Sequence, residues 1–145
     1  AFPRHAMKVS LESMIGDYLR EEPLEDICRS WGASNCRTKT LEMARWPRWL
    51  AIQFQRFEVD PQTLRRIKIA RAVHYPVDVR VGPAVSYNLR GVVLHTGTFE
   101  GGHYTAVVED GHQQWHLCDD AAEPTSVPAS KVVSTNAYML FYEQI

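Results

Sequence analysis

The sequence lacks the features that mark several large classes of protein. Its 145 residues include only three cysteines, Cys28, Cys36 and Cys118, and this odd number at wide spacing fits no disulfide framework. No apolar run approaches the roughly 18 residues that a membrane-spanning helix needs. No signal peptide is recognisable at the N-terminus. We therefore expect an intracellular protein, cytoplasmic or nuclear, that does not associate with membranes.

An excess of charge of either sign is also missing. Sixteen basic and seventeen acidic residues give a formal net charge of -1, which favours neither nucleic acid nor an anionic surface as a partner. Four basic residues between positions 65 and 71 are interpreted as a solvated face of a strand. Hydrophobic residues make up 45% of the chain and charged residues 23%, as in ordinary globular proteins. The length predicts one domain, residues 1–145.

Periodicity predicts one helix and several strands. Apolar residues recur at helical spacing over residues 11–21, with Ser10 as the N-cap and Pro23 as a stop. Alternation or apolar runs predict strands over residues 50–57, 65–73, 87–94 and 137–142. The predicted fold class is therefore α+β, a mainly antiparallel β-sheet with one helix.

A hairpin over residues 101–120 is the most informative stretch. Two β-prone runs flank Asp110-Gly111, and a two-residue turn at that dipeptide would place His103 opposite Cys118. Asp119 would then lie one position away, and a single β-bulge would bring it face to face with His103. A carboxylate beside an imidazole fixes its tautomer and stabilises its cation, as in a nucleophilic triad. The hairpin therefore predicts a general base and the group that orients it.

These residues resemble the histidine box of the ubiquitin-specific proteases. The matching motifs are Gly-Gly-His-Tyr-Thr-Ala at 101–106, Trp-x-x-x-Asp-Asp at 115–120 and Ala-Tyr-Met-Leu-Phe-Tyr at 137–142. Residues 47–57 and 87–97 are similar to the segments that precede this box in the family. The resemblance runs from about residue 10 to the end. It implies the palm and part of the fingers of a papain-like fold, with residues 10–45 as a helix and shortened fingers and residues 46–145 as the palm.

The resemblance also assigns roles to individual residues. His103 aligns with the catalytic histidine and Asp119 with the carboxylate that orients it. Asp120 aligns with a neighbour that helps to hold either the histidine or the oxyanion region. The glycine-rich loop before His103 lies over the ubiquitin tail in the family, so Gly101, Gly102 and Tyr104 are the candidate tail contacts.

The family's N-terminal cysteine box, of Asn-x-Gly-Asn-Thr-Cys type, has no counterpart here. We therefore expect the C-terminal half of a thiol-dependent deubiquitinase, which cleaves after the ubiquitin C-terminal glycine once a cysteine-bearing segment or chain completes it. The alternative is a catalytically inactive relative that binds ubiquitin or acts as a scaffold. The expected partners are ubiquitin or a ubiquitin-like protein and the segment that supplies the nucleophile. Cys118 is interpreted as a core residue rather than a substitute nucleophile.

No metal or other cofactor is expected. The fingers of the family often hold zinc between two Cys-x-x-Cys pairs, but Cys28 and Cys36 do not have that spacing and lack the partners for a four-ligand site. Two further histidines, His112 and His116, follow no metal-ligand spacing and are predicted to lie on the surface. His95 ends a predicted strand and could line the same cleft as His103.

Overall fold

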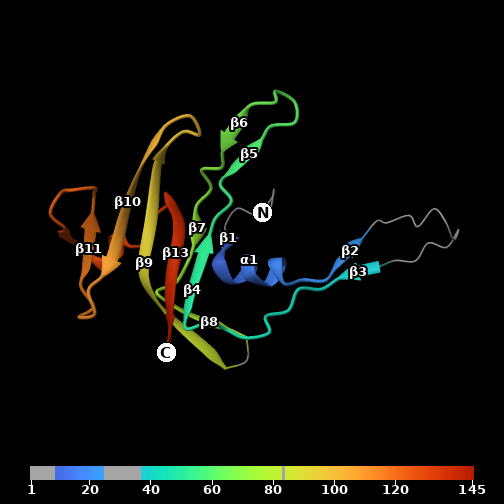
Figure 1. Cartoon of the computed structure of the whole chain (residues 1–145), viewed down its shortest axis with the longest axis horizontal. Helices are drawn as coiled ribbons and strands as arrows, with labels where there is room; N and C mark the ends of the chain where they lie inside the picture. The colour runs from blue at the N-terminus through green and yellow to red at the C-terminus, as the bar shows by residue number, and fades with distance from the viewer. Residues whose placement is uncertain (1–8, 25–36, 83) are drawn as a thin grey trace, which may run out of the picture.

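The computed structural model describes residues 9–24, 37–82 and 84–145 (Figure 1). The first part contains β1 (Val9–Ser10), α1 (Leu11–Tyr18), β2 (Glu22–Leu24), β3 (Arg37–Lys39), β4 (Trp49–Gln53), β5 (Phe57–Val59), β6 (Arg66–Lys68) and β7 (Val73–His74). The second part contains β8 (Asp78–Val81), β9 (Val85–Gly97), β10 (Gly102–Glu109), β11 (Trp115–Cys118), β12 (Thr125–Val127), the 3-10 turn η1 (Ala129–Lys131) and β13 (Ala137–Gln144). Cys28 and Cys36, for which no zinc site is predicted, lie outside the described residues.

Helix α1 begins where the sequence predicts and ends earlier. The Ser10 side chain accepts a hydrogen bond from the Ser13 backbone N–H at 3.2 Å, which confirms Ser10 as the N-cap. The last helical residue is Tyr18, and Leu19 closes the helix with a backbone bond to Ile15. Leu11 is buried in the core, so the apolar face of the helix packs against the sheet. Among the described residues α1 is the one α-helix. It lies beside β4 (Figure 1).

The main sheet has seven strands, and β9 lies at its centre. Its order is β12-β11-β10-β9-β13-β4, with β8 paired to the N-terminal part of β9, and these pairings are antiparallel. The predicted α+β class with a mainly antiparallel sheet and one helix is confirmed. Strand β9 also extends beyond the predicted 87–94, and its C-terminal end pairs with the start of β10.

The core lies between the sheet, α1 and the segment that contains β7. Three fully buried tyrosines complete their hydrogen bonds with backbone carbonyls, as buried phenols require. Tyr75 donates to Val132 at 2.7 Å, and Tyr142 donates to Pro76 at 2.7 Å. Tyr87 donates to the Pro47 carbonyl. These bonds anchor the loops around the sheet.

The strand predicted over 50–57 is interrupted, because Arg56 turns inward. Its guanidinium donates to the carbonyls of Ala137 at 2.6 Å, Ile69 at 3.0 Å and Arg71 at 2.8 Å. Desolvation lowers the pKa of Arg56. Since the side chain binds three backbone oxygens, the chain leaves β4 at Gln53 and starts again as β5.

The single strand predicted over 65–73 is two short strands, β6 and β7, in different sheets. Strand β6 pairs with β5 in a hairpin that projects from the main sheet, and β7 pairs in parallel with β1 (Figure 1). The segment between the histidine hairpin and β13 contains β12 and η1.

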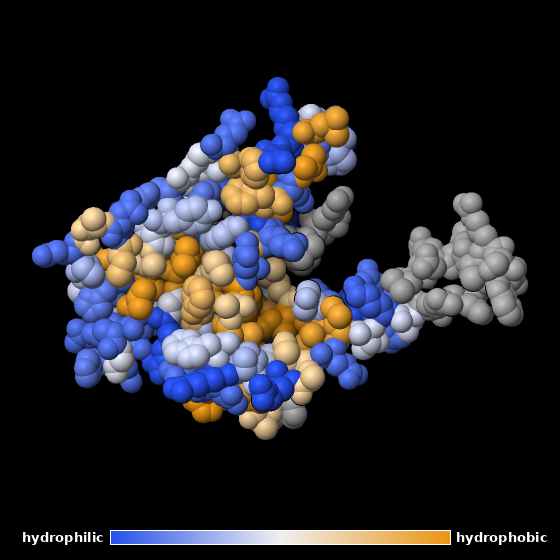
Figure 2. All heavy atoms as spheres, in the orientation of Figure 1, coloured by the Kyte–Doolittle hydropathy of each residue, from blue (hydrophilic) through white to orange (hydrophobic). Residues whose placement is uncertain are grey.

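A hollow of about 840 Å³ lies between α1, the β2–β3 hairpin and β4. Figure 2 shows hydrophobic side chains gathered in the middle of this face, between the main sheet and the β2–β3 hairpin. Met14, Trp46 and Leu50 are among the residues that line it. Among the described residues, no helix has the length and apolarity that crossing a membrane requires.

Candidate functional site

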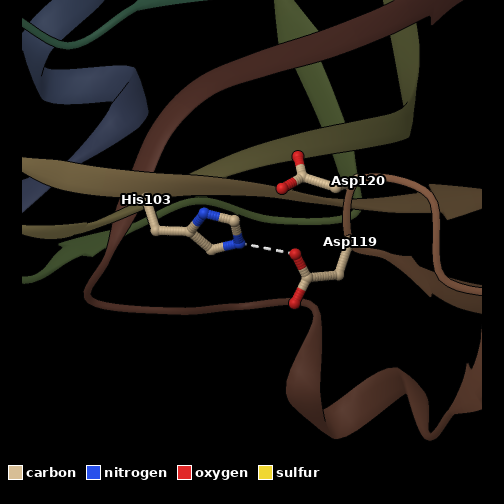
Figure 3. Close-up of side chains that lie close together, drawn as sticks. All are labelled: His103, Asp119 and Asp120. Carbon is tan, nitrogen blue, oxygen red and sulfur yellow. Dashed lines mark hydrogen bonds and ion pairs between the residues drawn. The ribbon is translucent and has the colours of Figure 1, made fainter.

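His103 and Asp119 lie in contact near the paired ends of β10 and β11. The His103 Nε2 atom is 2.5 Å from Asp119 Oδ1, and both side chains are about half exposed (Figure 3). His103 is the second residue of β10, and Asp119 directly follows β11. The structure therefore brings together the two residues that the sequence paired.

The strand register that was predicted to bring them together is wrong. Cys118 pairs with Ala106, not with His103. If the ladder continued by one residue, Asp119 would face Thr105, which is two positions from His103 on the same face of the strand. Diagonal neighbours on one face are within reach of long side chains, so the contact forms without the predicted bulge.

The difference in register comes from the loop between the strands. Residues 110–114 form the connection, closed by a hydrogen bond from the Asp110 N–H to the Gln114 carbonyl at 3.0 Å. Glu109 accepts hydrogen bonds from the N–H groups of Gly111 and Gln113, at 3.0 and 2.6 Å. The Asp110 carboxylate accepts from the N–H groups of His112 and Gln114. Both acidic side chains thus bind N–H groups within a longer loop than the two-residue turn predicted at Asp110-Gly111.

A tight turn aims both aspartates at the imidazole. The Ala122 N–H donates to the Asp119 carbonyl at 2.9 Å, and Asp120 has a φ of 45°, a left-handed conformation that aspartate tolerates better than most residues. Figure 3 shows the Asp120 carboxylate pointing toward His103 from beside Asp119.

The electrostatic surroundings of His103 favour its charged form. The hydrogen bond with Asp119 raises the pKa of His103, and the negative charge of Asp119 adds to the effect. Desolvation opposes this rise, and the charge of Asp120 contributes a smaller increase. An imidazole held in this way can take up a proton and remain stable as a cation.

One nitrogen or oxygen from each of His103, Asp119 and Asp120 lies within 4.8 Å of the others. These three donors could therefore reach one cation, although all three residues are exposed. Structural zinc requires four ligands, one more than this group offers. The sequence-based expectation of no metal here stays a prediction.

The glycines before His103 have different environments. At Gly102, an added Cβ would lie 2.2 Å from His95 Nε2 and 2.5 Å from the Thr96 carbonyl oxygen. At Gly97, where φ is 104°, it would lie 2.5 Å from the Gly101 carbonyl oxygen. An added Cβ at Gly101 would meet open space. Packing within the hairpin therefore explains the glycine at 102, whereas Gly101 and the half-exposed Tyr104 are open to a ligand.

Two residues beside this loop, His95 and Lys68, make more contacts with the fold than their sequence positions indicate. His95 ends a predicted strand and was one residue that could line the cleft, and only 3% of it is exposed. Lys68, interpreted as part of a solvated face, donates to the carbonyls of His95 at 2.8 Å and Gly97 at 3.2 Å. Imperfect alternation of basic and apolar residues in this strand was the one available signal that Lys68 differs from its neighbours.

The remaining residues of the hairpin that were singled out in the sequence differ in their burial. Trp115, the first residue of the motif at 115–120, is buried. His112 is exposed as predicted, but His116 is half-buried and lies 3.2 Å from Asp110 Oδ2. Cys118, predicted to be buried in the core, is half-buried.

Comparison with known proteins identifies relatives along most of this sequence. The family described as ubiquitin carboxyl-terminal hydrolase matches residues 26–142. The probable ubiquitin carboxyl-terminal hydrolase 8 of Schizosaccharomyces pombe is 31% identical over 140 residues, which cover 93% of this chain and 30% of the relative. The human ubiquitin carboxyl-terminal hydrolase 2 is 32% identical over 136 residues, 88% of this chain and 22% of the relative.

Solved structures agree with these sequence matches. A chain in the structure of the SAGA DUB module Ubp8/Sgf11/Sus1/Sgf73 bound to monoubiquitin superimposes with a TM-score of 0.83 at 26% identity. The match covers 96% of this chain and 33% of the other. A structure of the yeast SAGA DUB module gives the same TM-score and identity, over 95% of this chain and 33% of the other. The present chain thus spans about a third or less of the proteins that it matches.

Proposed function

Because the chain belongs to the ubiquitin carboxyl-terminal hydrolase family, we propose that it is the histidine-bearing part of a thiol-dependent deubiquitinase. A cysteine-bearing segment or chain completes the site, and the reaction is cleavage after the C-terminal glycine of ubiquitin. The observation that carries this proposal is the contact between His103 and Asp119 on a sheet like that of the family's solved members.

His103 acts as the general base and then as the general acid. With Nε2 bound to Asp119, Nδ1 is the nitrogen that remains to exchange a proton. Nδ1 takes the proton from the cysteine thiol, and the thiolate attacks the carbonyl carbon of the ubiquitin C-terminal glycine. Nδ1 then protonates the leaving lysine amine, which breaks the isopeptide bond and leaves a thioester on the cysteine. Water, deprotonated by His103, hydrolyses this thioester.

Asp119 orients the imidazole and stabilises the imidazolium that forms in each step. Asp120 adds a second negative charge that raises the pKa of His103 in the same direction. We assign Asp120 this supporting role because its carboxylate points toward His103 while Asp119 makes the hydrogen bond (Figure 3).

The loop before His103 supplies contacts to the ubiquitin tail. Gly101 leaves open space beside the backbone, and Tyr104 presents an exposed ring. Gly102 lies between them, and its backbone is the part available to the tail because packing excludes a side chain there. The expected partner is ubiquitin or a ubiquitin-like protein, and the expected location is intracellular, cytoplasmic or nuclear.

Supplying the missing nucleophile tests this function. The cysteine-bearing segment of a relative is added to this chain, and release of a fluorescent amine from the C-terminus of ubiquitin is measured. We expect hydrolysis from the combination and none from either part alone, and His103→Ala should abolish it. A combination that associates with the chain but releases no amine would favour the inactive, ubiquitin-binding alternative.

A ubiquitin carrying a C-terminal electrophile tests the chain by itself. Cys118 is half-buried and pairs with Ala106, away from the His103 register position, so we expect no covalent adduct. Mass spectrometry of the mixture checks this, with Cys118→Ser as the matched control. A stoichiometric adduct that disappears in Cys118→Ser would identify Cys118 as a nucleophile and overturn the need for a second segment.

A further inference from the structure

His95 is a buried histidine that has no part in the proposed reaction. Only 3% of it is exposed, and it pairs across the strands with Tyr104, the residue after His103. Since side chains alternate between the faces of a strand, His95 lies on the face of β10 opposite to His103. It belongs to an aromatic cluster in which its ring centroid is 4.6 Å from Tyr104, 5.6 Å from Phe57 and 6.1 Å from Tyr138.

The His95 ring occupies the space that a side chain at residue 102 would need. The Cβ position at Gly102 is 2.2 Å from Nε2 and 2.8 Å from Cε1 of this ring, distances that real Cβ atoms do not show. The backbone of Gly102 therefore rests directly on the imidazole. Because Gly102 precedes His103 in β10, the ring supports the backbone next to the point from which the His103 side chain projects.

The surroundings of His95 hold it in place and keep it neutral. Lys68 binds the carbonyl of His95 itself and that of Gly97, so the end of β9 is fixed from the β5–β6 hairpin. Burial lowers the pKa of His95, and the positive charge of Lys68 lowers it further. The Nδ1 atom is buried without a hydrogen-bond partner among the described residues, which also disfavours a charged ring.

We infer that His95 is a positioning residue, whose ring supports the Gly102 backbone and so fixes the direction in which His103 projects toward Asp119. The catalytic meaning of this role rests on the proposed function. The effect of His95 on the geometry of His103 does not depend on the proposed function, because the contact between His103 and Asp119 exists in this chain without a nucleophile.

The test is a pH titration of the His103 ring by NMR in this chain, with and without His95. In the unchanged chain we expect the pKa of His103 to lie above its ordinary 6.5. In His95→Ala the support is lost, the contact with Asp119 becomes intermittent, and the pKa of His103 should fall most of the way back toward 6.5. A raised pKa that persists in a folded His95→Ala chain would overturn the inference.

Two controls separate positioning from general destabilisation. Val81 is buried in β8 and pairs with Val85, at the other end of β9 from His95, so Val81→Ala should lower the melting temperature and leave the His103 titration unchanged. His112→Ala makes the same side-chain change in an exposed loop and should alter neither. If Val81→Ala shifted the His103 titration as much as His95→Ala, the effect would reflect stability and the positioning role would be rejected.

Lys68→Met supplies a second test that decides the matter if His95→Ala does not fold. It removes both hydrogen bonds to the end of β9 from a side chain that is only half-buried. We expect a smaller fall in the pKa of His103, and no fall would contradict the inference. Amine release by the completed enzyme is measured separately. Absence of amine release when the unchanged chain is combined with the cysteine-bearing segment would refute the proposed function. A His103 titration that is the same with and without His95 would refute only the role of His95.

Discussion

Strands β10 and β11 carry two histidine–aspartate pairs, one at each end, and the two pairs differ in what else the carboxylate does. His103 and Asp119 are 2.5 Å apart where the ladder opens, and His116 and Asp110 are 3.2 Å apart beside the connecting loop. The Asp110 carboxylate also accepts hydrogen bonds from the N–H groups of His112 and Gln114. Among the described residues, the Asp119 carboxylate has no hydrogen bond besides the one with His103.

If the proposed function is correct, this difference separates a pair that shapes a loop from a pair that takes part in the reaction. The pKa of Asp110 is lowered chiefly by the backbone N–H of His112, so that carboxylate serves mainly to shape the loop. The pKa of His103 is raised chiefly by Asp119, so that carboxylate serves the imidazole. Both pairs consist of a histidine and an aspartate, so residue type alone does not distinguish their roles. The other hydrogen bonds of each carboxylate do distinguish them.

The largest expected effect is on the activity of the completed enzyme. Asp119→Asn should lower the rate of amine release by up to about 10⁴-fold, because the amide N–H can donate to Nε2. The ring proton then lies on Nδ1, the nitrogen that must accept the proton of the thiol. Asp110→Asn is the matched control and should leave the rate nearly unchanged, since its loop lies at the opposite end of the strand pair. Similar losses in both variants would mean that neither pair is specifically catalytic.

A smaller effect concerns the His103 titration and the stability linked to it. In Asp119→Asn the pKa of His103 should fall toward its ordinary 6.5, because the hydrogen bond with the Asp119 carboxylate is the main cause of its raised value. A histidine with a raised pKa stabilises the fold fully below the unfolded value and loses this contribution as the pH rises through the folded value. The unchanged chain should therefore melt at a slightly higher temperature than Asp119→Asn near pH 6, and the two should converge above the folded pKa of His103.

The pH dependence of that difference is the discriminating observation. Because the pair is exposed, solvent screens it and the gap in melting temperature should be small. A gap that grows as the pH rises would have the wrong sign for a stabilised imidazolium. It would indicate that Asp119 supports the fold by another route.

The sequence predicted which residues meet at this site and failed to predict how. The hairpin, His103 and Asp119 could be identified because glycine, aspartate and alternating apolar residues are strong local signals. The register could not, because it depends on whether Glu109 and Asp110 bind the loop N–H groups, which the Asp-Gly signal does not reveal. The two residues are in contact despite the wrong predicted register, because the observed register keeps Asp119 on the same face as His103.

Long-range contacts explain the other failures. Arg56 interrupts a predicted strand because it reaches carbonyls at Ile69, Arg71 and Ala137, and no local pattern encodes these partners. Lys68 looked like a solvated charge for the same reason, since its acceptors are 27 and 29 residues away. The close approach of His95 to Gly102 likewise exists only once β9 and β10 are paired.

The smallest expected effect is on the contribution of Asp110 to the stability of the fold. Asp110 has a lowered pKa, so its contribution to stability is present above its ordinary value of 3.8 and is lost as the pH falls through the folded value. Asp110→Asn should lower the melting temperature modestly at neutral pH, because the amide oxygen still accepts some loop N–H groups and Glu109 retains its own. The difference should vanish under acidic conditions, and the His103 titration should be the same in both chains. A shifted His103 titration in Asp110→Asn would show that the loop sets the geometry of the distant pair, and the two pairs would then have to be treated as one unit.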